Sequence, residues 1–204
     1  MSVTLEQLYE KQKELDARII REKGLEGVDL LPNTVLALQV EIGELANEWR
    51  GFKHWSNDRE PRTSVKTCLA CSGIDVPDVF GLCPICNSEN PMLTEYVDCL
   101  HFFLSIARQL DLPADDLYAW EDIAEGNTTI LFSELLHNVG LIHADNMLEI
   151  PIKDVKNYRR EHFKAALFIF YALGEQRLGF DFDQIAAAYL DKNKTNHERQ
   201  ANGY

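Results

Sequence analysis

Two pairs of carboxylates stand at a spacing that could build a metal site. Glu41 and Glu44 are three residues apart, as are Glu95 and Asp98, so each pair falls on one face of a helix. Pairs at this spacing also occur elsewhere in so acidic a chain, and the spacing alone is weak. Both pairs, however, lie in segments that are apolar nearly all round, which is typical of buried helices.

Buried carboxylates are costly unless they meet a cation or a metal ion. Residues 35–46 and 96–107 contain no Lys or Arg that could pair with them. Facing helices with oxygen ligands suit Mg²⁺, which prefers octahedral oxygen coordination shared with substrate phosphates. We therefore predict a catalytic Mg²⁺ site. The alternative is that these acids lie on a solvated face with distant Arg partners.

The cysteines indicate a second metal. Cys68 and Cys71 form one Cys-x-x-Cys pair, and Cys83 and Cys86 form another after 11 intervening residues. This pattern predicts a structural Zn²⁺ held by four thiolates, within an inserted module at residues 56–91. Unpaired core cysteines are the alternative, but polar, proline-rich surroundings make a poor core. No secretory signal is visible, and we expect a reducing, cytoplasmic location.

Helices must position both sets of ligands. Apolar spacing and capping residues predict an all-α domain formed by residues 1–55 and 92–204, interrupted by the module at 56–91. No convincing alternating strand appears outside the cysteine segment. The expected helices cover residues 4–23, 33 to beyond 49, 93–110, 114–124, 128–144, 153–178 and 181–199, and Asn33, just after Pro32, is the expected N-cap of the second.

Composition limits the ligand classes. The chain has 204 residues, with 20 Lys+Arg against 33 Asp+Glu, a net charge of −13. This acid excess argues against a nucleic acid polymer, because phosphate backbones need basic surfaces. A single nucleotide remains compatible, because metal ions can hold its phosphates. No apolar run approaches the ~18 residues of a transmembrane helix, so no membrane partner is expected.

The acidic motifs resemble those of the all-α NTP pyrophosphatases, the MazG-like enzymes, and more specifically the dimeric all-α dUTPases. The resemblance covers the chain except residues 56–91 and implies a MazG-like helical bundle with a zinc-ribbon-like insert. Beside the carboxylate pairs, the matching pieces are Gln12-Lys-Glu-Leu-Asp16, Phe52-Lys-His-Trp55, Cys99-Leu-His101-Phe102 and Lys192-Asn-x-x-Asn196-x-x-Arg199-Gln-x-x-Gly-Tyr204. The last piece is the most specific.

The resemblance implies a role for each matching residue. Glu41, Glu44, Glu95 and Asp98 would hold Mg²⁺, and Glu44 would also orient and deprotonate the attacking water. Gln12 would contact uracil. The remaining substrate-binding residues would be Lys53 and Trp55 beside the base, His101 and Phe102 at the base and sugar, and Lys192, Asn196, Arg199 and Tyr204 closing over the nucleotide and its phosphates.

The implied activity is Mg²⁺-dependent hydrolysis of dUTP to dUMP and pyrophosphate, and also of dUDP, by a homodimer. One alternative is a related all-α pyrophosphatase for dCTP or mixed dNTPs. Another is a zinc-ribbon binding module without catalysis. Between Cys68 and Cys86 there are two Asp and no Lys or Arg, which speaks against nucleic acid binding by that module. The insert is not general in the family, so the loop near the base pocket can differ.

Overall fold

A computed structural model describes residues 3–63, 90–118, 123–143 and 152–203. These residues form six α-helices and no strand, which confirms the predicted all-α fold. The helices are α1 (Leu5–Lys23), α2 (Leu31–Trp49), α3 (Pro91–Gln109), α4 (Thr128–Leu141), α5 (Val155–Ala172) and α6 (Phe182–Ala201), with a 3₁₀ turn η1 (Ala114–Leu117) and a π-helical turn η3 (Leu173–Leu178).

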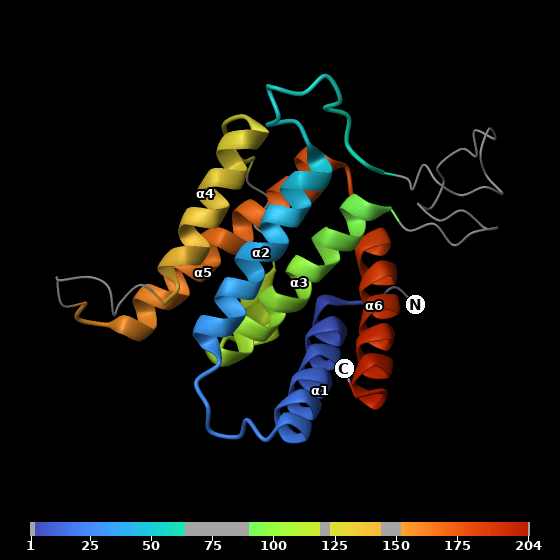
Figure 1. Ribbon diagram of the computed structural model, residues 1–204. Coiled ribbons are helices and arrows are strands. Elements are labelled where there is room, and N and C mark those ends of the chain that lie inside the picture. The colour runs from blue at the N-terminus through green and yellow to red at the C-terminus, as the bar shows by residue number, and fades with distance from the viewer. Residues whose placement is uncertain (1–2, 64–89, 119–122, 144–151, 204) are drawn as a thin grey trace.

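Helices α2 and α3 lie side by side through the middle of the bundle (Figure 1). Helices α4 and α5 pack together on one side of this pair, and α1 and α6 pack together on the other. Helix α3 is the most deeply buried element, with 11 of its 19 residues in the interior. Among the described residues, no helix is long and apolar enough to cross a membrane.

Capping residues set several helix ends where the sequence predicts them. The Thr4 hydroxyl and the Gln7 side chain form a capping box at the start of α1, and Gly24 ends that helix in the left-handed conformation. Asp181 and Gln184 form the equivalent box at the start of α6. Both helices therefore begin one residue after the start of the predicted ranges 4–23 and 181–199.

Helix α2 begins earlier than expected. We predicted Asn33 as its N-cap, but the helix already includes Leu31, whose N–H donates to Asp29 Oδ1 at 3.1 Å. Pro32 lies in the first turn, where its missing N–H costs nothing and its fixed φ suits a helix. The proline is thus part of the helix, and the prediction of Asn33 as cap was wrong.

Two other segments differ from the predicted helices. Of the range 114–124, the described residues 114–118 form only η1, with Tyr118 extended after it, and residues 119–122 lie outside the described part of the chain. Within η1 only Leu117 is buried, too small an apolar face to stabilise a short α-helix. The helix expected at 153–178 leaves α-geometry after Ala172 and widens into η3.

The turn η3 has a steric reason to contain glycine. A Cβ at Gly174 would collide with the ring of Tyr96 on α3. That ring stacks on Phe170 with 4.2 Å between the centroids, and its hydroxyl donates to the Phe170 carbonyl at 3.3 Å. This contact fixes the rotation of α3 at the residue next to Glu95.

The predicted cysteine module lies largely outside the described residues, and so do its four cysteines, Cys68, Cys71, Cys83 and Cys86. Its first residues, up to Thr63, are described and attach to the helical domain. Arg62 N–H donates to the Glu48 carbonyl at 2.9 Å, and the Arg62 carbonyl accepts from Met92 N–H at 3.2 Å. Cys99, by contrast, is fully buried in α3, as expected of a core thiol.

Candidate active site

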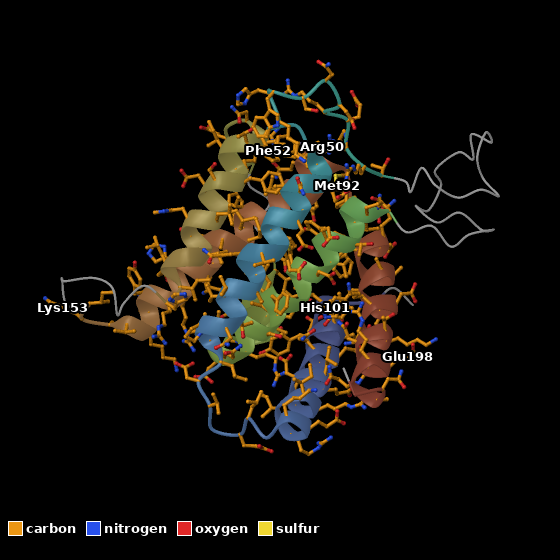
Figure 2. The ribbon with its side chains drawn as sticks, viewed as in Figure 1. Arg50, Phe52, Met92, His101, Lys153 and Glu198 are labelled. Atoms are coloured by element: carbon orange, nitrogen blue, oxygen red, sulfur yellow. The ribbon has the colours of Figure 1, made fainter. Side chains whose placement is uncertain are left out.

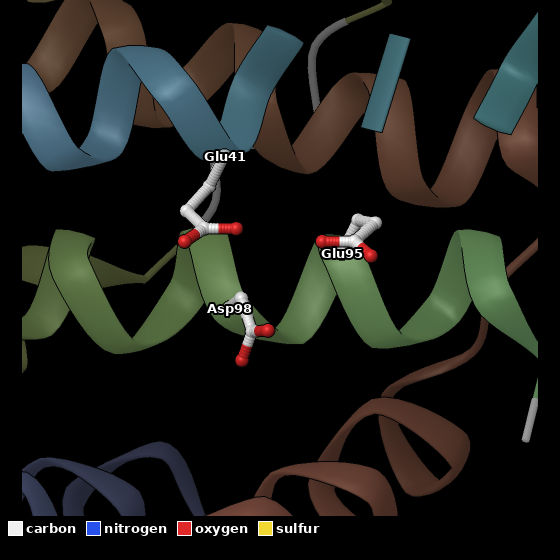
Figure 3. Close-up of side chains that lie close together, drawn as sticks. All are labelled: Glu41, Glu95 and Asp98. Carbon is white, nitrogen blue, oxygen red and sulfur yellow. The ribbon is translucent and has the colours of Figure 1, made fainter. Parts of the chain in front are cut away.

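Three of the four predicted metal ligands come together between α2 and α3. One carboxylate oxygen each from Glu41, Glu95 and Asp98 lies within 4.8 Å of the other two. Glu41 projects from α2 toward α3, and Glu95 and Asp98 lie one turn apart on α3 (Figure 3). All three side chains are half-buried. The two helices therefore present oxygen ligands from both sides of one small space.

The same geometry raises the pKa values of the three carboxyl groups. Burial, followed by the charge of Asp98, raises the pKa of the Glu95 carboxyl to about 7. Burial also raises the pKa of Glu41, with further contributions from Asp98 and Glu44, and burial raises the pKa of Asp98. Carboxylates that hold their protons this strongly lack sufficient positive charge nearby, and this is the electrostatic condition that a divalent cation relieves.

One cation from outside the two helices does reach the cluster. The Lys192 ammonium on α6 donates to Asp98 Oδ2, and both side chains are about four-fifths shielded from solvent. Its charge also lowers the pKa values of Glu41 and Glu95. Three carboxylates facing this ammonium would still leave two negative charges if all were ionised.

Glu44 lies apart from the three clustered oxygens. It is exposed on α2, one turn beyond Glu41, and is not among the residues whose oxygens lie within 4.8 Å of one another. Its charge nevertheless raises the pKa values of Glu41, Glu95 and Asp98. Glu44 is thus close enough to act on the cluster while its carboxylate remains open to solvent.

Gln12 is buried, and its amide is used completely by protein partners. Its Nε2 donates to Asp16 Oδ1 at 2.7 Å and to Ser105 Oγ at 2.9 Å. Its Oε1 lies 2.7 Å from His101 Nδ1 and accepts from the Tyr189 hydroxyl at 2.7 Å. In this arrangement Gln12 has no donor or acceptor left for a uracil base.

His101 lies one turn beyond Asp98 on α3, 5% exposed, with its ring stacked on that of Tyr189 at 4.0 Å. Burial, with a contribution from the Lys192 charge, lowers its pKa to about 3, so the ring is neutral. Its Nε2 is buried without a partner among the described residues, as is the Nδ2 of Asn193 on α6. Phe102, next to His101, is half-buried against the core.

Lys53 and Trp55 lie in the loop after α2, at the Met92 end of α3. Figure 2 shows the neighbouring Phe52 at that end and His101 farther along the bundle. Trp55 is 67% exposed and meets Phe52 edge-on, with 5.7 Å between centroids. Among the described contacts, the structure does not bring this pair together with Gln12 and His101.

The remaining predicted residues belong to the last turns of α6. Asn196 is half-buried and Arg199 is exposed, with a charge that lowers the pKa of Asp98. Between them, the His197 carbonyl accepts from Arg18 Nη1 at 2.9 Å, which attaches this part of α6 to α1. Tyr204 lies outside the described residues.

Sequence reasoning assigned no role to a set of polar residues that complete this side of the site: Asp16, Ser105, Arg108, Tyr189 and Asn193. A signal for some of them was present. Ser105 and Arg108 follow His101 by four and seven residues, a polar stripe on one face of an otherwise apolar helix.

The model of a protein family described as dUTPase matches residues 4–68 and 86–204. The unmatched residues between them lie inside the segment that carries the four cysteines. No curated protein matches the chain.

Proposed function

Because the chain belongs to the all-α dUTPase family, it is a dUTP diphosphatase, and we propose that it hydrolyses dUTP to dUMP and pyrophosphate with Mg²⁺. The same chemistry applied to dUDP would yield dUMP and phosphate. The observation that carries the proposal is the cluster of Glu41, Glu95 and Asp98 between two facing helices.

These residues fit a divalent ion. The donors are all carboxylate oxygens, they come from two rigid helices, and their charge exceeds that of the Lys192 ammonium beside them. Glu41, Glu95 and Asp98 would hold Mg²⁺, with Glu44 joining them at the solvent side. Bound there, Mg²⁺ would neutralise phosphate charge and lower the pKa of a coordinated water.

Glu44 is the proposed general base. Its side chain is exposed to solvent and lies one turn from Glu41. A carboxylate oxygen of Glu44 can therefore accept a proton from water at the edge of the cluster. The water oxygen forms the new bond to the α- or the β-phosphorus, the proton goes to Glu44, and the P–O bond of the oxygen that bridges them breaks, so that dUMP and pyrophosphate separate.

The basic residues of α6 are proposed to bind phosphate. Lys192 lies at the carboxylate cluster, and Arg199 is seven residues farther along the same helix, hence near the same face. Asn196 lies between them. Charge-assisted hydrogen bonds from these side chains would position the triphosphate against the acids.

Base recognition is proposed to use the side of the site that contains His101. Its Nε2 can accept a hydrogen bond, and Asn193 Nδ2 can donate one; both are buried and unpartnered among the described residues. A ligand that leaves such buried atoms without a hydrogen bond binds less tightly than one that pairs with them. Phe102, Lys53, Trp55 and Tyr204 remain proposed contacts, the last outside the described residues.

We further propose a homodimer and a structural Zn²⁺. Leu36 and Val40 on α2 are 61% and 51% exposed and lie one turn apart, an apolar stripe that a second copy could cover. Light scattering coupled to size exclusion tests the dimer directly.

The assay that tests the function measures pyrophosphate release from each dNTP with Mg²⁺ or with EDTA. We expect release from dUTP to exceed that from dTTP and dCTP by at least ~100-fold in kcat/KM. Glu44→Gln should lower turnover by orders of magnitude and leave the helical circular dichroism spectrum unchanged. Comparable rates on dCTP would favour the mixed-dNTP alternative, and near-normal turnover of the variant would refute the role of Glu44.

A further inference from the structure

Gln12 occupies the centre of a buried hydrogen-bond network that joins three helices. Asp16 lies one turn beyond it on α1 and also accepts from Ser105 Oγ and Arg108 Nη1, each at 2.9 Å. His101 approaches from α3, and Tyr189 approaches from α6. Both polar atoms of the Gln12 amide, Nε2 and Oε1, therefore have hydrogen-bond partners.

Asp16 determines which way the Gln12 amide faces. The amide group could in principle be turned by 180°, exchanging its oxygen and nitrogen. Burial raises the pKa of Asp16, but hydrogen bonds from Gln12 and Ser105 and the charge of Arg108 oppose that rise and favour the ionised form, which can only accept. The Gln12 amino group must therefore face Asp16, which directs Oε1 toward His101 and Tyr189.

This orientation fixes the tautomer of His101. The Gln12 oxygen can only accept, so the His101 nitrogen 2.7 Å away, Nδ1, must carry the proton. The ring is neutral, and its other nitrogen, Nε2, therefore presents a lone pair. That lone pair is buried, one helical turn from the carboxylate cluster, and has no donor among the described residues.

We propose that Asp16 acts through Gln12 as a positioning residue that holds His101 Nε2 as a hydrogen-bond acceptor for an N–H or O–H donor of the bound nucleoside. This inference rests on the proposed function and assigns Gln12 to positioning rather than to base contact. Two donors are available on deoxyuridine: the N3–H of uracil and the 3′-hydroxyl of the sugar. Cytosine has no N3–H, so a contact to the base would also select against dCTP.

The tautomer can be measured without turnover. Nitrogen-15 NMR of the metal-free protein should show His101 protonated at Nδ1 only. In Asp16→Asn, the residue facing Gln12 offers both a donor and an acceptor, and we expect a mixture of both tautomers. Gln12→Met removes the acceptor and should move the proton to Nε2. Glu22→Gln, a matched loss of charge on the exposed face of α1, should leave the tautomer unchanged.

A wild-type His101 protonated at Nε2 would overturn the proposal, whether or not the variants fold. So would Nδ1-only protonation in both the Asp16→Asn and Gln12→Met variants.

Binding identifies the donor. The probes are non-hydrolysable α,β-imido-dUTP, its N3-methyl derivative and its 2′,3′-dideoxy derivative, each titrated with wild type and with His101→Ala. We expect Gln12→Met to weaken imido-dUTP binding about tenfold, the value of one buried hydrogen bond, and Asp16→Asn to weaken it less, in proportion to the share of protein in the other tautomer. Whichever derivative loses affinity for wild type but not for His101→Ala lacks the donor.

Equal losses with both proteins for both derivatives would overturn the acceptor role. Hydrolysis by the wild type is scored separately. A chain that binds imido-dUTP through His101 but releases no pyrophosphate from dUTP would refute the proposed function alone.

Discussion

Replacing Glu95 by Gln should stabilise the metal-free protein at alkaline pH. In the folded state Glu95 is half-buried beside Glu41 and Asp98, and its pKa rises from 4.5 to about 7. A raised carboxyl pKa means that folding favours the protonated form. The stabilisation of the protonated form is therefore complete below pH 4.5 and is lost as pH rises through 7. Above pH 7 the ionised Glu95 opposes folding.

The magnitude follows from the shift. A change from 4.5 to about 7 corresponds to about 3 kcal/mol at ~1.4 kcal/mol per unit. Because the side chain is partly solvated, screening reduces this, and we expect about 1–2 kcal/mol. For a chain of this length, that is about 3–6 °C in Tm.

The assay is thermal unfolding in EDTA at pH 8 and at pH 4.5, followed by the same scan at pH 8 with excess Mg²⁺. The Tm of Glu95→Gln should exceed that of wild type at pH 8, and the difference between the two Tm values should shrink toward pH 4.5. Mg²⁺ should then raise the Tm of wild type more than that of the variant. Glu134→Gln, which removes an exposed carboxylate on α4, should change little at either pH. A variant no more stable than wild type at pH 8, or a gap independent of pH, would refute the electrostatic reasoning.

The remaining predictions concern the cation partners. Lys192→Gln should tighten Mg²⁺ binding about fivefold, because the ammonium of Lys192 competes with Mg²⁺ for Asp98. Calorimetry without nucleotide measures this, and weaker Mg²⁺ binding by the variant would contradict the prediction. The same variant should bind imido-dUTP more weakly than wild type. Metal analysis of protein purified without added zinc should find about one Zn²⁺ per chain. Cys83→Ser should lose that zinc and lower Tm while the helical spectrum persists, and native protein with four reactive thiols and no zinc would disprove the assignment.

The helices and the carboxylate cluster were accessible from the sequence for a simple reason. Apolar periodicity and i, i+3 carboxylates are local signals, and a helix places residues at these spacings on one face. The cluster of Glu41 with Glu95 and Asp98 needed only one further step, the packing of two buried helices.

The other features of the site and the fold depend on contacts between residues far apart in the sequence. No local pattern pairs Lys192 with Asp98 across 94 residues, or Tyr189 with Gln12 across 177. Gln12 was assigned to the base because the resemblance identified the residue, but only the packing of α1, α3 and α6 shows that its amide is saturated. The π-helical turn was equally hidden, because the steric conflict between Gly174 and Tyr96 is tertiary.

The position of α6 in the chain has a consequence for biosynthesis. Helix α6 is translated after the other described helices, α1 to α5, yet it supplies Tyr189 to the Gln12 network and Lys192 to the carboxylates. A nascent chain that has made only α1 to α5 therefore exposes the faces of α1 and α3 that α6 covers, and its carboxylates lack that lysine. Closing a contact across 177 residues is entropically slow. Catalytic competence should thus appear only after α6 has been made, and a separately made α6 peptide is the natural half of a split-enzyme reporter.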